Sequence, residues 1–86
     1  MPYAITLKPS ARRELAKLPK PDGERIARAI DGLAHQPRRQ GCKKLANVDD
    51  LWRIRVGDYR VVYRIEDARL VVLVVRIGHR RDVCRA

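Results

Sequence analysis

Two short segments of this 86-residue sequence contain the residues best suited to bind an anion and to act on it. Residues 52–60 read WRIRVGDYR, in which arginines alternate with apolar side chains, and residues 78–81 read GHRR. Guanidinium groups bind phosphate through paired hydrogen bonds and keep their charge at any ordinary pH. A histidine titrates near neutrality and can transfer a proton. Together these residues have the chemistry of a phosphate-binding site.

The first segment predicts a β-hairpin with two chemically different faces. Gly57-Asp58 fits a two-residue loop with glycine in its first position, which places Arg55 opposite Arg60. Side chains then alternate between the two faces of the sheet. The apolar face, expected to form the core, is predicted to contain Trp52, Ile54, Val56, Tyr59, Val61, Tyr63 and Ile65. The other face, which we call the arginine face, is predicted to contain Arg53, Arg55, Arg60, Val62 and Arg64.

The predicted pairing of Arg55 with Arg60 is a functional signal because like charges directly opposite one another destabilise a sheet. The arrangement becomes favourable when an anion lies between the two side chains, and phosphate is the natural anion. Alternatively, these arginines are solvated, or are paired with carboxylates of the C-terminal tail or of an acidic partner. The sequence leaves both interpretations open.

The charge of the whole chain favours a polyanionic partner. Twenty Lys and Arg against ten Asp and Glu give a formal net charge of +10. Every Lys or Arg after residue 50 is an arginine, the residue suited to phosphate contacts and to stacking on bases. Nucleic acid is the commonest such partner, and an acidic protein or a solvated basic surface is the alternative.

The elements expected around the hairpin form a single α+β domain over residues 1–86, with two N-terminal helices packed on a small twisted antiparallel sheet in the order β-α-α-β-β-β. Ser10 is predicted to cap the first helix and Asp22 the second, which reaches residue 36. Pro19 and Pro21 are expected to break the chain between them. The strands are predicted at residues 3–7, 51–56, 59–65 and about 70–77.

Sequence signals of export, membrane insertion and metal binding are absent. Cys42 and Cys84 do not make a disulfide framework, and there is no CxxC motif or Cys/His cluster. The N-terminus lacks the apolar run of a signal peptide, and the longest apolar stretch, residues 70–75, is too short to span a membrane. We therefore expect a cytoplasmic protein with no metal, no other cofactor and no membrane association.

Residues 43–84, KKLANVDDLWRIRVGDYRVVYRIEDARLVVLVVRIGHRRDVC, resemble the C-terminal half of the RelE toxins. The segments LWRIRVGDYRVVY and IGHRRDV are distinctive of this superfamily, and the first half of the chain has its layout. The resemblance implies a toxin of a type II toxin–antitoxin system, with a cognate RelB-like antitoxin, the ribosome and mRNA as partners. RelE toxins cleave mRNA at the ribosome by attack of a ribose 2′-hydroxyl on the adjacent phosphate. Two alternatives are a ParE-like toxin, which shares the fold but inhibits DNA gyrase, and a degenerate toxin that retains only antitoxin binding.

The resemblance assigns roles to four arginines. The basic pair of the family's RIRV strand falls on Arg53 and Arg55, the arginine of GDYR is Arg60, and the arginine after GH is Arg80. These residues would hold the scissile phosphate and stabilise charge in the transition state. Nearby residues expected to contact RNA are Lys43, Lys44, Arg64 and Arg81, with solvated side chains as the alternative for the two lysines.

This sequence departs from the family at the proton-transfer residues. Cys84 replaces the aromatic residue that closes the motif in the ribonucleases, and a thiol cannot stack on a base. Arginine is a poor general acid or base, so His79 is a candidate for proton transfer, or else a histidine that packs at the end of a strand. Cys84 could be a thiolate activated by the neighbouring arginines, or a small apolar tail residue.

Overall fold

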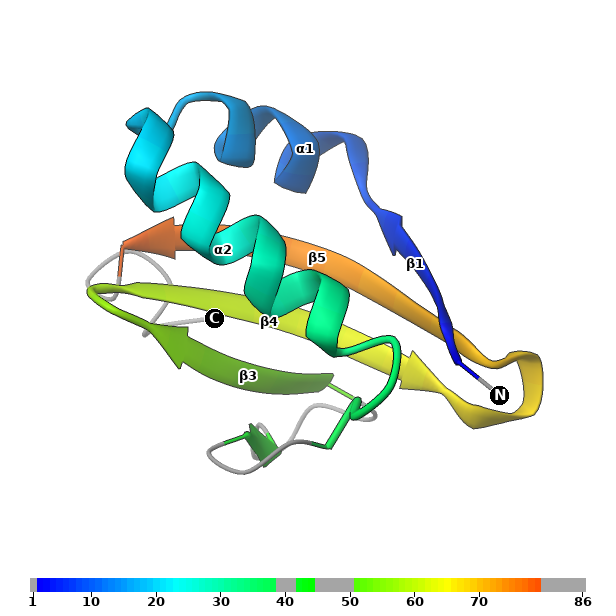
Figure 1. Ribbon diagram of the computed structural model, residues 1–86. Coiled ribbons are helices and arrows are strands. Elements are labelled where there is room, and N and C mark those ends of the chain that lie inside the picture. Colours follow the sequence, from blue (N-terminus) through cyan, green and yellow to red (C-terminus); the bar gives the residue numbers. More distant parts are fainter. Residues whose placement is uncertain (1, 39–41, 45–50, 80–86) are drawn as a thin grey trace.

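The computed structural model describes residues 2–38, 42–44 and 51–79, in which two helices cover one face of a five-stranded sheet (Figure 1). The helices are α1 (Pro9–Ala16) and α2 (Lys20–Gly32). The strands are β1 (Ala4–Leu7), β2 (Lys43–Lys44), β3 (Leu51–Val56), β4 (Tyr59–Glu66) and β5 (Val71–His79). A short 3₁₀ helix, Asp67–Arg69, joins β4 to β5.

The predicted α+β class is confirmed, and the order of elements follows the prediction with one short strand, β2, added. The sheet is mixed rather than wholly antiparallel. Its strand order is β1-β5-β4-β3-β2. β2, β3, β4 and β5 pair antiparallel, as expected, whereas β1 runs parallel to β5, with Ala4 opposite Val71 and Leu7 opposite Val74. The first strand therefore lies beside the last one, and the two helices carry the chain across the sheet from β1 at one edge toward β2 at the other.

Both helices begin earlier than predicted, at prolines rather than at side-chain caps. α1 starts at Pro9 with Lys8 as its N-cap, and α2 follows Pro19 with no capping side-chain hydrogen bond. Proline suits the first turn of a helix because its missing N–H has no partner there. Pro21 therefore lies inside the first turn of α2 rather than breaking the chain, and α2 ends at Gly32.

The core lies between the two helices and the predicted apolar face of the hairpin, which confirms the assignment of that face. Trp52 and Tyr59 are half-buried at its margins. Tyr63 is fully buried, and its hydroxyl donates to the Pro37 carbonyl at 2.7 Å. The buried residues of this cluster include Ile26, Ile30, Leu33, Ile54, Val61, Ile65, Val72, Val74 and Ile77.

A β-bulge in β5 changes which side chains face the helices. Tyr63 pairs with Val74 but Val62 pairs with Arg76, so Val75 is an extra residue on β5. Without it, alternation from Val74 would turn residues 76 and 78 toward the helices. With it, Ile77 turns inward and is 1% exposed.

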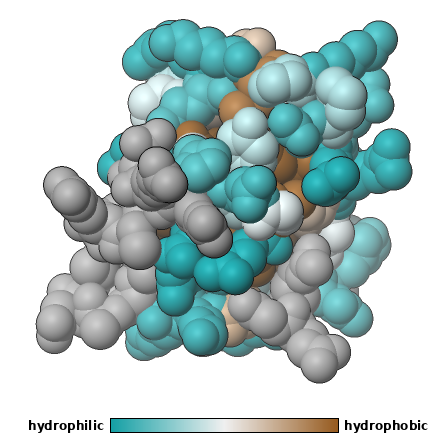
Figure 2. Space-filling view, turned by 90° about the vertical axis from the view of Figure 1, so that its left-hand side faces the viewer, coloured by the Kyte–Doolittle hydropathy of each residue, from teal (hydrophilic) through white to brown (hydrophobic). Residues whose placement is uncertain are grey.

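The surface at the end of the molecule that contains the hairpin turn is mostly hydrophilic. Figure 2 shows this end, where hydrophobic atoms are visible only in gaps between polar side chains. Among the described residues, neither helix has the length and apolar content needed to cross a membrane.

Candidate phosphate-binding site

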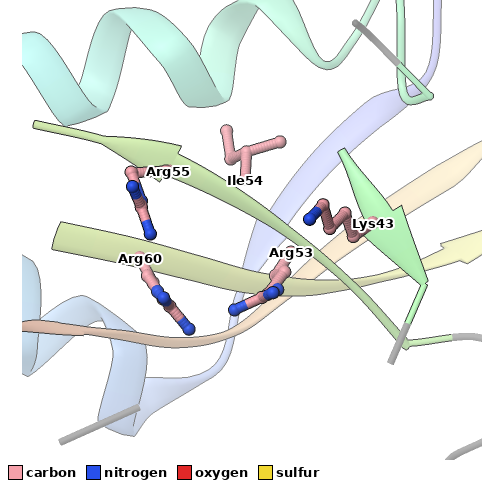
Figure 3. Close-up of a pocket in the computed structure, with 5 residues that line it drawn as sticks. All are labelled: Lys43, Arg53, Ile54, Arg55 and Arg60. Atoms are coloured by element: carbon pink, nitrogen blue, oxygen red, sulfur yellow. The ribbon is translucent and has the colours of Figure 1, made fainter. Parts of the chain in front are cut away.

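A pocket on the arginine face brings together four cationic side chains from three neighbouring strands. Its volume is about 270 Å³. In Figure 3 the guanidinium groups of Arg53, Arg55 and Arg60 extend from β3 and β4 into a common region on the side away from α2, with the Lys43 amine nearby. Among the described residues, the lining consists of Lys43, Arg53, Ile54, Arg55 and Arg60, and none of these is acidic.

Strand register explains why these four side chains meet. Arg55 pairs directly with Arg60, and Arg53 pairs directly with Lys43. Side chains of directly opposed residues share a face and lie close together. The Gly57-Asp58 turn fixes the first of these pairings, as predicted from the sequence, and Gly57 has the positive φ of 60° that such a turn needs.

Arg60 is the most buried of the four cationic residues of the pocket, and it lies on the central strand of the sheet. It lies on β4 between Arg55 of β3 and Gly78 of β5, and it is 9% exposed, whereas Arg55 is exposed and Arg53 is half-buried. A buried guanidinium remains charged. Because strands pair with β4 on both sides and the Arg60 side chain is buried, the guanidinium has little room to move before an anion arrives.

Two further predicted RNA-binding residues lie outside this pocket. Lys44 pairs with Trp52, so its side chain leaves β2 on the opposite side from Lys43. Arg64 lies on the arginine face, exposed, between Leu51 and Leu73. The register therefore brings one of the two lysines to the arginines, and it places Arg64 farther along the same face.

His79 lies on the other side of the sheet from the arginine pocket. It pairs with Tyr59, and the two rings meet edge to face with centroids 5.9 Å apart. Both rings line a second hollow, of about 280 Å³, under the start of α2 together with Asp22. The Tyr59 hydroxyl donates to Asp22 at 3.3 Å, and burial, followed by the Asp22 charge, raises the pKa of Tyr59. The structure thus does not bring His79 to the phosphate pocket.

Arg76 joins the arginine face, although sequence reasoning missed it. Val62 lies directly between Arg53 and Arg76 across the three central strands. In a strand without the extra residue Val75, Arg76 would face the helices and His79 would lie on the arginine face. With it, Arg76 lies on the arginine face and His79 faces the helices. The sequence signal was the spacing of the apolar residues Val72, Val74 and Ile77, which breaks strict alternation.

An ion pair ties the segment after α2 to the β4–β5 connection, at the far end of the sheet from the hairpin turn. The Arg38 guanidinium donates to both carboxylate oxygens of Asp67, at 3.1 and 2.8 Å, and the Tyr3 hydroxyl donates to the same carboxylate at 2.6 Å. These bonds, led by that of Arg38, lower the pKa of Asp67 to about 2. Arg38 also lies over the Trp52 ring, 5.2 Å from its centroid.

Comparison with known proteins identifies the family. A family model described as the ParE toxin of the type II toxin–antitoxin system parDE matches residues 5–83. The toxin RelG of Mycobacterium tuberculosis is 34% identical over 99% of this chain and 99% of its own length. The chain belongs to the RelE/ParE toxin family. The toxin RelE of the same organism is 32% identical over 92% of this chain and 82% of its own.

Solved structures of RelE/ParE family members share this fold. The RelBE2 toxin–antitoxin complex of M. tuberculosis matches with a TM-score of 0.81 and 32% identity over 93% of this chain and 100% of that one. The archaeal RelE–RelB complex of Pyrococcus horikoshii OT3 matches with a TM-score of 0.81 and 29% identity over 93% and 97%. The protein is therefore a toxin of a type II toxin–antitoxin system.

Three residues predicted from the RelE resemblance lie outside the described residues. These are Arg80, Arg81 and Cys84. The part of the candidate site that lies within the described residues is therefore formed by β2, β3 and β4, and Arg76 of β5 lies on the same face.

Proposed function

We propose that this protein is a RelE-type endoribonuclease that cleaves mRNA at the ribosome. The observation that carries the proposal is the pocket in which Lys43, Arg53, Arg55 and Arg60 line one hollow, with no acidic residue in the described part of the lining. Such a site suits a phosphate diester. The similarity to toxins named RelG and RelE supports the same assignment.

The reaction would be an internal phosphoryl transfer. The ribose 2′-oxygen attacks the adjacent phosphorus and the bond to the 5′-oxygen breaks, which leaves a 2′,3′-cyclic phosphate and a 5′-hydroxyl. The proton lost from the 2′-hydroxyl is matched by one gained at the 5′-oxygen. Negative charge grows on the phosphate oxygens in the transition state, and fixed cationic donors stabilise that charge. Arg60 is the best-placed donor because it is the most buried of the four cationic residues.

The pocket's contribution is phosphate binding and charge stabilisation rather than proton transfer. Its cationic lining consists of one lysine and three arginines, and arginine does not act as a base. We propose that Arg80 adds a further guanidinium to the phosphate. His79 lies across the sheet, so any role it has in the reaction would be indirect.

We also propose that a RelB-like antitoxin neutralises the toxin by covering the arginine face. Structures of RelE-type toxins in complex with RelB support such a partner. The net charge of +10 favours an acidic antitoxin segment that folds as it binds. Affinity for the antitoxin should fall as salt rises, with apolar contacts preserving part of it.

Primer extension on mRNA tests the ribonuclease proposal. Purified toxin is added to a translation reaction programmed with a defined mRNA, and the positions of new 5′ ends are mapped. We expect cuts within the coding region that appear only when ribosomes translate the message. If the toxin stopped protein synthesis in this reaction while the mRNA stayed intact, the result would contradict the proposal.

Inhibition of DNA gyrase without cleavage is the second candidate function. It is favoured by the match to the ParE family model over residues 5–83 and by the absence of a proton-transfer residue from the described pocket lining. A supercoiling assay with purified gyrase separates the two candidates. Inhibited supercoiling together with intact mRNA would select the gyrase target, and the reverse result would select RNA.

A further inference from the structure

The arginine face continues past the pocket to β5, where Arg76 lies. Arg53, Val62 and Arg76 are consecutive partners across β3, β4 and β5. Val62 is 2% exposed, yet it is not part of the cluster under the helices, as expected for a residue on the arginine face. Arg76 is half-buried, so part of its side chain remains accessible.

Glu14 of α1 contacts β5 directly after the bulge that turns Arg76 to this face. β1 ends at Leu7, opposite Val74, so beyond that pair β1 no longer covers the edge of β5. There the backbone N–H of Ile77 donates to Glu14 Oε1 at 3.0 Å. This hydrogen bond holds the Ile77 backbone just after the bulge, so we infer that it helps to keep the preceding side chain, Arg76, on the arginine face.

Two rows of arginines therefore run across the sheet in parallel. Arg55 and Arg60 form one row, and Arg53 and Arg76 form the other with Val62 between them. Two residues along a strand separate the rows, about 6.8 Å. Within the second row the two Cα atoms are roughly 10 Å apart, two strand spacings, and long guanidinium side chains can close on one anion from that separation.

We propose that Arg53 and Arg76 form a second phosphate subsite that binds a phosphate adjacent to the scissile one on the same RNA strand. This inference rests on the proposed ribonuclease function and deepens it. Arg55 and Arg60 hold the phosphate that reacts. Arg53, which also lines the pocket, joins Arg76 in setting where the strand lies. Arg76 is then a binding residue for the RNA backbone, and Glu14 is a positioning residue that acts through it.

Salt dependence of RNA binding tests the subsite. Affinity for a short single-stranded RNA with a non-cleavable 2′-deoxy linkage is measured at several salt concentrations. Each neutralised phosphate contributes about 0.7 to the slope of log affinity against log salt concentration. We expect Arg76→Ala to lower this slope by about 0.7. In cleavage assays the same variant should raise KM several-fold and leave kcat close to that of the wild type.

Arg28→Ala is the matched control. It removes the same formal charge from an exposed position on α2, away from the arginine face, and should leave the slope unchanged. An Arg76→Ala slope equal to those of the wild type and Arg28→Ala would overturn the subsite and leave the ribonuclease proposal intact. A wild-type protein that neither binds nor cleaves RNA would overturn both.

Variants of Glu14 separate positioning from simple stabilisation. Glu14→Gln keeps an oxygen that can accept from Ile77 and should retain the wild-type slope. Glu14→Ala should lower the slope as Arg76→Ala does, and the double variant should show no further decrease because both changes remove the same contact. Equal slopes for Glu14→Ala and Glu14→Gln, in folded proteins, would show that Glu14 does not position Arg76. If this row binds an acidic protein rather than RNA, Arg76→Ala should bind RNA as the wild type does and bind the antitoxin more weakly. That result would overturn the RNA subsite.

Discussion

Arg55 and Arg60 lie directly opposite one another on β3 and β4. The Arg55 side chain is exposed, whereas Arg60 is buried. Like charges directly opposite one another on a sheet repel, and an anion bound between the two side chains would offset that repulsion. The pairing therefore links the stability of the empty toxin to the binding of phosphate, and this link can be measured without any RNA.

Inorganic phosphate should stabilise the protein. A ligand that binds the folded state raises Tm in proportion to the logarithm of its concentration above Kd. We expect phosphate to raise Tm more than chloride does at matched ionic strength. The difference should shrink in Arg55→Ala and Arg60→Ala and persist in Arg28→Ala. Identical phosphate effects in all four proteins would show that the arginine pair does not bind the anion.

Alanine at position 57 should destabilise the hairpin that builds the pocket. Gly57 has a φ of 60°, and a Cβ there would come within 3.0 Å of Arg25 Nη1. A non-glycine residue in this conformation costs about 1–2 kcal/mol. Urea unfolding of Gly57→Ala should show a loss of that size. The control is Gly32→Ala at the end of α2, where a Cβ would meet no atom within 4 Å; an equal loss there would rule out backbone strain as the cause.

Acid should weaken the tie between Arg38 and Asp67. The pKa of Asp67 is lowered from 3.8 to about 2, so its carboxylate stabilises the folded state above its unfolded pKa. That contribution is lost as the pH falls from about 4 toward 2. We expect the free energy of unfolding of the wild type to fall in this range by more than that of Asp67→Asn. Parallel pH profiles for the two proteins would contradict the assignment.

Restoring a ring at position 84 should raise cleavage. The RelE resemblance places an aromatic residue there, which would stack on the target nucleotide, and Cys84 cannot do so. Cleavage rates on mRNA should be higher for Cys84→Tyr than for the wild type. Cys84→Ser, which adds no ring, should not be faster, and equal rates for all three proteins would show that position 84 does not limit the reaction.

The hairpin could be predicted in detail because its information is local. The Gly57-Asp58 turn fixed the pairing of Arg55 with Arg60, and alternation then assigned both faces. The parallel pairing of β1 with β5 could not be predicted, since it joins the two ends of the described chain. The faces on which Arg76 and His79 lie were harder to predict, because one extra residue at Val75 interrupts the alternation of β5. The only sign of it in the sequence is the uneven spacing of apolar residues, and the Glu14 carboxylate that accepts a hydrogen bond just after the bulge is more than sixty residues away.

The rate of mRNA cleavage by Arg60→Ala tests the central claim most directly. Loss of one preorganised donor from a phosphate site typically lowers the rate by about 10²–10³-fold. In translation reactions analysed by primer extension, we expect that loss in Arg60→Ala, a smaller loss in Arg55→Ala, and wild-type cleavage by Arg28→Ala. Circular dichroism confirms that each variant is folded. Undiminished cleavage by folded Arg60→Ala would contradict the assignment of this pocket as the site that binds the scissile phosphate.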